Sequence, residues 1–427
     1  MLDIKFVRAF PASVRQDLEK RGDKEKQAWF EDLLKKDELY RRLLQETEAL
    51  RADRNKVSKA VSEAKKAGAD ASSLLAAAAA IPGQIKEKEE QAVAAQEQVR
   101  FYLMRLPNVL HESVPVGKTG DDNVVVRSWG NPRQDRTKSH VDILEPYGLA
   151  DLERATKTSG SRFYFLKNEL VLLDYALMRY GLDFLWKRGF QLIEPPYMML
   201  KKPYEGVTDL ADFENVMYKI EGEDLYLIAT SEHPMGAMHQ NEIFEPDQLP
   251  LKYAGVSACF RKEAGAHGKD TKGIFRVHQF NKIEQFIFSK PEDSWKLHEE
   301  LLKNAESFFQ SLELPYRIVN ICTGDIGTVA AKKYDLEVWM PAQQTYREAV
   351  SCSNCTAYQA TRLNIKYRLK PGSDEKEWLH TLNSTLVATS RAIVAIIENN
   401  QQADGAITVP KVLHPYTGGM TEIKPKK

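Results

Sequence analysis

The sequence predicts an α+β protein in which a long antiparallel two-helix coiled-coil arm precedes a domain that contains a β-sheet. Residues 27–105 are rich in Ala, Glu, Lys, Gln and Arg and carry a heptad pattern. Residues 256–263 and 276–284 alternate with a period of two, as strands do. Proline, glycine and acidic residues gather between these parts, as in a linker.

The bulk composition limits the classes of protein that this chain can belong to. The 427 residues suffice for two or three domains. The 60 basic residues balance the 60 acidic ones, so any contact with nucleic acid must come from a local patch. Four cysteines argue against a disulfide scaffold and for a reducing compartment. Because no signal segment or long apolar run occurs, we expect a cytoplasmic protein that does not enter a membrane.

The arm is expected to contain two helices joined near residues 67–72. Heptad seams run from Trp29 to Ala64 and from Leu75 to Leu103. Between them, Ala-Gly-Ala-Asp-Ala-Ser supplies a break and an N-cap, and helices joined by a short loop pack antiparallel. Pro82 predicts either a kink in the second helix or a late start.

The boundary of the arm is set by Pro107, because the residue before a proline avoids the helical region. A loop follows, and Val124-Val125-Val126 opens the next domain. We therefore expect an arm domain over residues 1–110, with its coiled coil at about 27–105, and a second domain over residues 111–427.

Basic residues concentrate toward the tip of the first helix: Arg41, Arg42, Arg51, Arg54, Lys56, Lys59, Lys65 and Lys66. One interpretation is a plain dimerising coiled coil, because charge runs are usually solvated faces. The other is an arm that holds helical RNA by its phosphates. The residues alone leave both open.

The second domain carries a charged strand face. Alternation places Arg261 and Glu263 opposite Val256, Ala258 and Phe260. After a flexible basic loop, one further face holds Arg276, His278, Phe280, Lys282 and Glu284. Because buried charge needs partners, this face is not an ordinary core face. It suits a ligand that is charged and flat, such as a nucleoside triphosphate together with a small zwitterion.

This region contains Phe-Arg-Lys-Glu-Ala-Gly and then Arg-Val-His-Gln-Phe-Asn-Lys-Ile-Glu284. Its sequence resembles motif 2 of class II aminoacyl-tRNA synthetases. It looks like the seryl-tRNA synthetase family, and the resemblance extends over essentially the whole chain. Residues 170–196 resemble motif 1, with Pro196 at the family's proline position. Residues 381–391 resemble motif 3 and are interpreted as a polar turn entering an apolar helix. The resemblance implies a mixed, mainly antiparallel sheet flanked by helices, and a homodimer built on motif 1.

The resemblance also implies a site for L-serine, ATP and Mg²⁺. Arg261 would bridge the serine carboxylate and the α-phosphate, Arg391 would hold the γ-phosphate, and Glu348 would help to bind magnesium. These three are the expected catalytic residues. Phe280 would stack on adenine and Glu263 would contact its amino group.

Each ligand has its own expected set of residues. The serine set is Thr230, Ser231, Glu232, Arg261, Glu284, Asn383 and Thr385. The ATP set is Arg261, Lys262, Glu263, Arg276, Val277, Phe280, Glu348, Ala349, Val350, Ser351 and Arg391. The expected metal contacts are Glu348, through ATP, and Ser351. Cys352-Ser-Asn-Cys355 has the spacing of half a zinc site, but no second cysteine pair exists, so we expect buried thiols and no zinc.

The function that the resemblance implies is ATP-dependent ligation of L-serine to tRNA(Ser) through a seryl-adenylate. The arm would grip the long variable arm of the tRNA, and tRNA(Sec) stays open as a second substrate. No Walker A loop or dinucleotide fingerprint occurs, so side chains must meet the phosphates. The alternatives are a related amino acid ligase, an RNA-binding paralogue without charging activity, and a coiled-coil scaffold.

Overall fold

The computed structural model describes residues 1–209, 216–263 and 272–426. The chain divides into two compact units, one of Leu2–Leu106 and the other of Met1 together with Pro107–Lys427.

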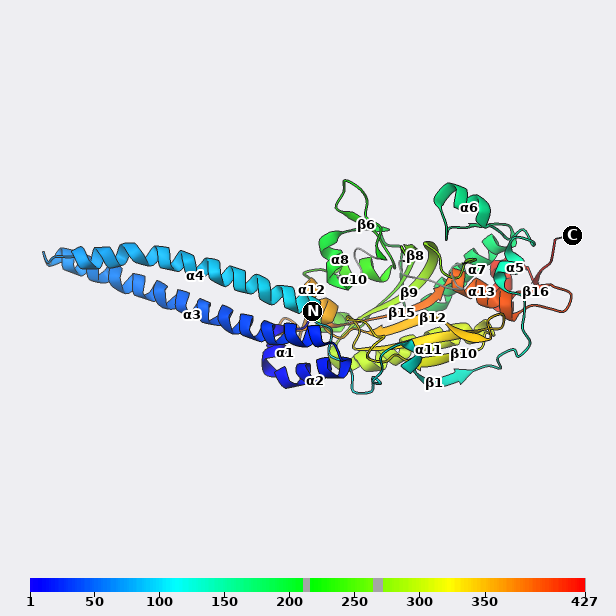
Figure 1. The fold of residues 1–427 in the computed structure, drawn as a ribbon, viewed down its shortest axis with the longest axis horizontal. Coiled ribbons are helices and arrows are strands. Elements are labelled where there is room, and N and C mark those ends of the chain that lie inside the picture. Colours follow the sequence, from blue (N-terminus) through cyan, green and yellow to red (C-terminus); the bar gives the residue numbers. More distant parts are fainter. Residues whose placement is uncertain (210–215, 264–271, 427) are drawn as a thin grey trace. The chain divides into compact units, whose positions relative to one another are not determined.

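The first unit is all-helical. It contains α1 (Ile4–Ala9), α2 (Pro11–Arg21), α3 (Lys24–Lys66) and α4 (Ser72–Arg105). The two long helices lie side by side and run in opposite directions (Figure 1). Leu43 of α3 packs against Ala92 and Ala95 of α4 and excludes water along the seam. The prediction of an antiparallel helical arm is confirmed.

Pro82 neither delays nor ends the second helix. It lies inside the continuous α4, so the expectation of a late start is wrong. Ile81 and Ile85 are buried on either side of it, and this packing holds the helix through a position where one backbone hydrogen bond is missing. Pro107 acts as expected, because α4 ends at Arg105 and Leu106 is extended.

An eight-stranded sheet organises the second unit, in the order β1-β10-β11-β12-β15-β9-β8-β4. All neighbouring pairs are antiparallel except β4 with β8, so the prediction of a mixed, mainly antiparallel sheet is confirmed. The strands are β1 (Val124–Trp129), β4 (Gln191–Ile193), β8 (Leu251–Phe260), β9 (Gln279–Ser289), β10 (Tyr316–Asn320), β11 (Lys332–Met340), β12 (Thr345–Asn354) and β15 (His380–Ala388).

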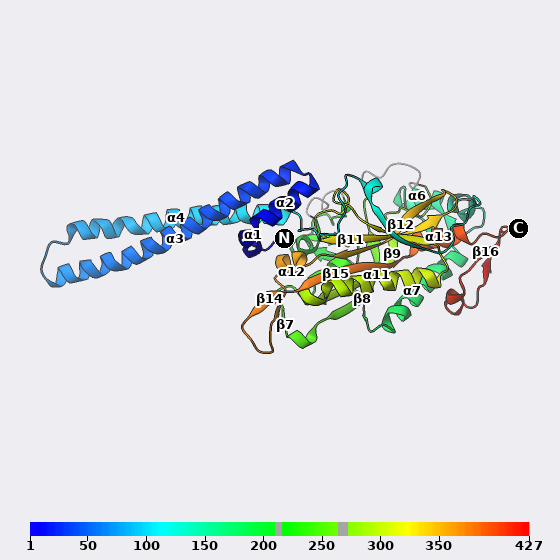
Figure 2. The same ribbon diagram turned by 90° about the horizontal axis from the view of Figure 1, so that it is seen from below.

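Three helices pack on this sheet and share one hydrophobic core with it: α7 (Glu169–Trp186), α11 (Ser294–Ser311) and α13 (Thr389–Asn399). Figure 2 shows α11 lying along the strands. Smaller elements complete the unit: α5 (His140–Leu144), β2 (Ala150–Asp151), α6 (Leu152–Ser159), β3 (Phe165–Leu166), β5 (Met198–Leu200), α8 (Lys201–Val207), β6 (Leu225–Leu227), α10 (Glu232–Ala237), β7 (Ile243–Phe244), α12 (Tyr358–Leu363), β13 (Lys366–Arg368), β14 (Lys376–Trp378), β16 (Ile407–Thr408) and β17 (Glu422–Ile423).

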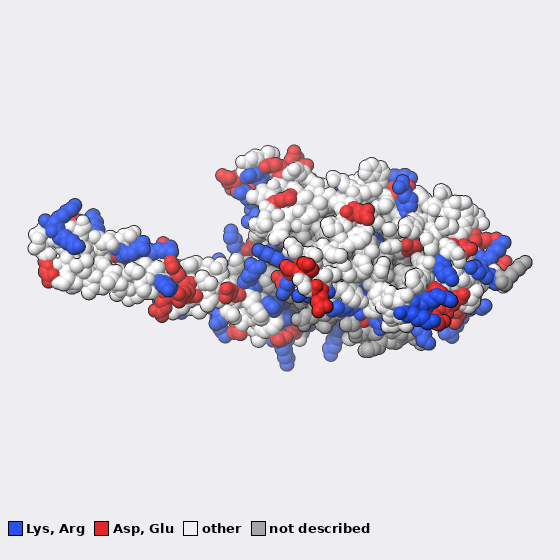
Figure 3. All heavy atoms as spheres, turned by 90° about the horizontal axis from the view of Figure 1, so that it is seen from above, with Lys and Arg blue, Asp and Glu red and all other residues white. Residues whose placement is uncertain are grey.

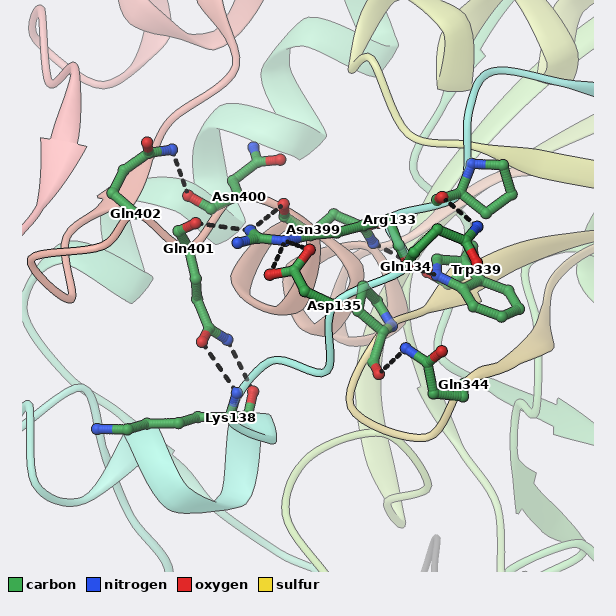
Figure 4. Close-up of polar contacts among 12 residues, drawn as sticks. Arg133, Gln134, Asp135, Lys138, Trp339, Gln344, Asn399, Asn400, Gln401 and Gln402 are labelled. Carbon is green, nitrogen blue, oxygen red and sulfur yellow. Dashed lines mark hydrogen bonds and ion pairs between the residues drawn. The ribbon is translucent and has the colours of Figure 1, made fainter.

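The C-terminal end of α13 is fastened by side chains from outside the helix (Figure 4). The Arg133 guanidinium donates to the carbonyl oxygens of Asn399, at 3.3 Å, and Gln401, at 2.6 Å. Trp339 of β11 donates from Nε1 to the Arg133 carbonyl, and Asn399 Nδ2 donates to the Trp339 carbonyl, both at 2.9 Å. The contact with Asn399 satisfies a carbonyl at the end of the helix, and the four hydrogen bonds together hold α13 against β11.

Motif 3 differs from its prediction in one respect. Residues 381–388 form the strand β15 in the middle of the sheet and not a polar turn. Their polar side chains are buried because neighbouring side chains satisfy them. For example, Thr381 donates to Gln359 at 2.6 Å.

Two further observations bear on the cellular setting. Within the described ranges, no helix combines the length and the apolar character needed to cross a membrane. Cys259, Cys322, Cys352 and Cys355 are all free and buried.

Candidate active site

A cavity of about 430 Å³ opens over the middle of the sheet and gathers side chains from several elements. It is lined in part by Arg261, Phe280, Glu284, Glu348 and Arg391, which come from two strands, a strand end and a helix. The structure therefore brings together residues that lie up to 130 positions apart in the chain. Both basic and acidic groups line the cavity.

Arg261 lies one residue past the end of β8, so the strand is shorter than its alternation predicts. Its Nε donates to the Ala229 carbonyl at 3.2 Å, and its guanidinium lies 5.3 Å from the centre of the Phe280 ring. Glu263 is also outside the strand and has a positive φ of 48°. The expected basic loop, residues 264–271, lies outside the described residues.

The alternation on β9 holds as predicted from Phe280 onward. Phe280, Lys282 and Glu284 face the cavity, whereas Gln285 contacts α11 on the other side. Lys282 Nζ lies 2.5 Å from Glu284 Oε2, and Thr385 Oγ1 of β15 donates to the same oxygen at 3.2 Å. All three side chains are at least nine-tenths buried, so the ion pair is shielded from water.

A second carboxyl group approaches this corner from α10. Glu232 Oε1 accepts from Asn383 Nδ2 at 3.1 Å and from Gln359 Nε2 at 3.5 Å. Burial, followed by the negative charge of Glu284, raises the pKa of Glu232 to about 7. The two carboxyl groups and the Asn383 and Thr385 side chains make a polar pocket suited to an ammonium and a hydroxyl group.

A β-bulge places two expected residues on the same side of β12. The pairing of β11 with β12 shifts register between Leu336 and Glu337, so Ala349 has no direct partner. Without this bulge, Glu348 and Ser351 would point to opposite faces, because three positions separate them. With it, both line the cavity.

The surroundings shift the pKa values of Glu348 and Asp335 in opposite directions. The Arg391 guanidinium, with Nη1 at 3.3 Å from Glu348 Oε1, lowers the pKa of Glu348. Burial and the nearby charge of Glu348 raise the pKa of Asp335 to about 8. Asp335 lies opposite Ser351 in the strand register. Its Oδ1 is buried and accepts no hydrogen bond from the described part of the chain.

Arg391 occupies the first turn of α13, as predicted, and stands between the cavity and a second hollow of about 490 Å³. The hollow shares Glu348 and Arg391 with the first cavity and adds Arg276 and Arg347. The Arg391 guanidinium also lies 5.4 Å from the ring centre of Phe275. The two adjoining spaces are together called the channel, and both arginine and acidic side chains line it.

Not every expected residue reaches this channel. Val277 and Val350 lie in the hydrophobic core, and Ser231 donates to the Gly255 carbonyl at 3.2 Å. Thr230 is buried and accepts from the Glu232 amide. The Lys262 amide donates to Val216, and Glu263 lies 3.8 Å from Arg276.

Three features of the cavity were not in the expected set. Lys282 could have been included, since alternation already placed it on the face of Glu284. His233 follows Glu232 directly, but a single histidine gives no clear signal. The wall formed by residues 326–330 belongs to a segment without any motif, so the sequence offered no means of finding it.

The fold and the cavity together match one class of enzymes. The family model of the tRNA synthetase class II core domain (G, H, P, S and T) covers residues 216–400. The seryl-tRNA synthetase N-terminal domain covers residues 1–110.

Comparison with individual proteins identifies the family within this class of enzymes. A serine–tRNA ligase from Methanocella arvoryzae is 61% identical, over 98% of this chain and 99% of its own. The crystal structure of seryl-tRNA synthetase from Pyrococcus horikoshii complexed with ATP superimposes with a TM-score of 0.97, at 51% identity over 100% of both chains. The cytoplasmic serine–tRNA ligase from Naegleria fowleri in complex with AMP gives 0.92, at 38% identity over 100% of this chain and 99% of that one. The chain belongs to the seryl-tRNA synthetase family.

Proposed function

We propose that this chain attaches L-serine to tRNA(Ser) in two steps. First, a serine carboxylate oxygen bonds to the α-phosphorus of ATP and pyrophosphate leaves, which gives seryl-adenylate. Second, the terminal ribose hydroxyl of the tRNA attacks the seryl carbonyl, AMP leaves, and a phosphate oxygen takes the hydroxyl proton. The observation that supports this proposal most directly is the position of Arg261. It lines the same cavity as Arg391 and the polar pocket that contains Glu232 and Glu284. Relatives over the full length are serine–tRNA ligases, which favours this function over the alternatives.

Electrostatics explain why the site needs its arginines. Two anions must meet in the first step, and a guanidinium can bind a carboxylate and a phosphate oxygen at once. We assign that bridge to Arg261 and the γ-phosphate to Arg391. Phe280 offers a flat face to adenine, with Arg261 already lying near it. Glu263 would accept from the adenine amino group, and Arg276 adds charge where pyrophosphate departs. Ala349, Val350 and Val277 lie in the core and can contribute only main-chain or packing contacts to ATP, whereas Lys262 would add a positive charge.

The acidic pocket supports serine as the amino acid. The ammonium group would lie between Glu284 and Glu232, and the hydroxyl would bond to Thr385 or Asn383. Thr230 and Ser231 hold the backbone of this corner. A polar pocket discriminates strongly against a substrate that lacks the matching hydroxyl.

The pocket assignment can be tested by ATP–pyrophosphate exchange with a panel of amino acids. We expect exchange with serine, and at least about a hundredfold less with alanine, which leaves the polar groups unpaired. Exchange that is independent of serine would contradict the proposed substrate. Exchange without subsequent charging of tRNA(Ser) would instead favour an amino acid ligase with another acceptor.

Magnesium fits the acidic wall of the channel. The buried Oδ1 of Asp335 is an oxygen ligand without a partner among the described side chains, and it lies close to Glu348 and Ser351. Mg²⁺ usually takes one or two carboxylates and completes its shell with phosphate oxygens and water. Glu348 and Ser351 would hold the ion, which would neutralise phosphate charge when bound. In the described residues, no group of three or more His, Cys, Asp and Glu side chains could hold a metal without such substrate oxygens.

The arm is proposed to bind the tRNA. Figure 3 shows basic side chains gathered over its free end. Lys56 and Lys59 of α3 are each 79% exposed there, so their charges are available to phosphates. The N-terminal family domain of the seryl-tRNA synthetases coincides with this unit. Such contacts would recognise the shape of a long RNA helix and not its base sequence. Binding measurements with tRNA(Ser) and tRNA(Sec) would therefore decide whether the protein accepts one or both.

We also propose a homodimer in the cytoplasm. Three large apolar side chains of α7 are exposed, Leu172 by 50%, Tyr175 by 67% and Trp186 by 63%, and Leu192 on the edge strand β4 is 41% exposed. Exposed large apolar side chains on one helix and a neighbouring edge strand favour an interface there. Sedimentation should give twice the monomer mass, and Tyr175→Glu should shift it toward the monomer. The four free thiols support a reducing compartment.

A further inference from the structure

A buried tyrosine hydroxyl lies behind the active-site wall and contacts it at two points. Tyr204 of α8 is fully buried. Its hydroxyl accepts from the Ala229 amide at 3.1 Å and lies 3.0 Å from Nδ1 of His233, whose side chain lines the cavity. The rings of Tyr204 and His233 are 4.8 Å apart.

The Ala229 peptide connects this hydroxyl to Arg261. Its carbonyl accepts from Arg261 Nε at 3.2 Å, while its amide donates to Tyr204. Ala229 follows β6 in a short connection to α10, where regular strand pairing does not hold the backbone. The Tyr204 hydroxyl is thus one of the groups that fix the height and tilt of the carbonyl to which the arginine is bonded.

We propose that Tyr204 is a positioning residue for Arg261, acting through the Ala229 peptide, and that His233 holds the tyrosine hydroxyl in place. This inference rests on the proposed function, in which Arg261 bridges the serine carboxylate and the α-phosphate. The chemistry explains the residue type, since a phenol can accept from an amide while its single proton is shared between acceptors, here His233 Nδ1 at 3.0 Å and Met217 Sδ at 2.9 Å. Burial, with Lys282 and Arg261 nearby, keeps the pKa of His233 well below its usual range, so the imidazole is neutral at pH 7.

Tyr204→Phe removes only the hydroxyl oxygen. We expect kcat for serine-dependent ATP–pyrophosphate exchange, normalised to titrated active sites, to fall at least about tenfold, because Arg261 is displaced in the transition state. The matched control is Tyr367→Phe. Tyr367 is also buried in the same hydrophobic cluster, but its hydroxyl donates to the exposed Glu377 at 3.0 Å. That variant should keep wild-type exchange.

A double-mutant cycle separates positioning from a general structural effect. Arg261→Lys keeps the charge but lacks the Nε donor that bonds to Ala229. The probe is the non-hydrolysable analogue seryl-sulfamoyl-adenosine, whose affinity is measured by calorimetry on the full-length protein. If Tyr204 acts through Arg261, Tyr204→Phe should weaken binding about tenfold in the wild type and less than twofold in the Arg261→Lys background.

Two outcomes decide the matter. Equal loss of affinity in both backgrounds would overturn the positioning role, since a general loss of stability would appear in each. Wild-type affinity in Tyr204→Phe would overturn it as well. Failure of the wild type to bind the serine analogue would instead refute the proposed function, so the two ideas fail separately.

Discussion

Glu284 provides the sharpest test of the serine pocket, because its charge is buried and has defined partners. Its carboxylate lies 2.5 Å from Lys282 Nζ and accepts from Thr385 at 3.2 Å, while Lys282 and Glu284 are only 5% and 1% exposed. Glu284→Gln keeps the shape but leaves the lysine charge without its counter-ion. Breaking a buried pair in this way costs about 3–5 kcal/mol of the free energy of unfolding.

Activity should fall by a separate mechanism. The proposed ammonium contact of serine to Glu284 is a charge-assisted hydrogen bond, worth about 1.5–3 kcal/mol, and it is lost together with the counter-charge. We expect kcat/KM for serine to fall at least about a hundredfold, which is about 2.7 kcal/mol. Glu284→Ala should abolish exchange. The assay is serine-dependent ATP–pyrophosphate exchange, run beside chemical denaturation.

Adding Lys282→Met separates the two effects. The double variant Lys282→Met with Glu284→Gln no longer buries an unpaired charge, so much of the lost stability should return while exchange stays low. Glu377→Gln, on an exposed carboxylate, is the control and should change neither quantity. If Glu284→Gln exchanges at near wild-type rates with an unchanged KM for serine, the pocket has been placed wrongly.

Three further predictions concern pH and the arm. Burial raises the pKa of Glu232 from 4.5 to about 7 and of Asp335 from 3.8 to about 8, so the folded state favours their protonated forms. Both groups should therefore make the ligand-free protein less stable as pH rises from about 4.5 to 8, by up to about 1.4 kcal/mol per pH unit for each group. The lowered pKa values of the buried His233, His298 and His380 act in the opposite sense up to about pH 6.5. The decisive measurement is therefore the comparison with Glu232→Gln, which should remove one downward contribution to the slope, and identical profiles for the two proteins would contradict the assignment. Deleting residues 30–100 joins Trp29 to Phe101, whose ring centres already lie 6.0 Å apart. This deletion should spare ATP–pyrophosphate exchange and reduce tRNA(Ser) charging by orders of magnitude. Undiminished charging would refute the RNA role of the arm. Pro82→Ala should stabilise α4 by up to about 3 kcal/mol, because it restores a helical hydrogen bond at an exposed position. Thermal unfolding of the arm measures this change. An unchanged unfolding transition would show that the helix already accommodates the proline.

The accuracy of the sequence-based predictions followed the range of the interactions involved. The two arm helices were predictable because their heptad seam and the stop at Pro107 are local signals. Phe280, Lys282 and Glu284 were placed on one face because strand alternation is local too. Residues 381–388 were misjudged as a turn. Their hydroxyl and amide groups look solvated in the sequence, but partners such as Gln359 and Glu284 satisfy them inside the sheet.

The sequence by itself determined the order of the helical arm and the sheet domain, and the chemical identity of the groups that meet in the cavity. Its motifs were also enough to indicate the family. Only the tertiary structure decided which of these groups face one another. The bulge at Ala349 turns Glu348 and Ser351 to the same side, and residues 326–330 close the wall without any recognisable motif. The contact of Tyr204 with the Ala229 peptide likewise depends on packing between distant segments, and no local pattern in a chain encodes that.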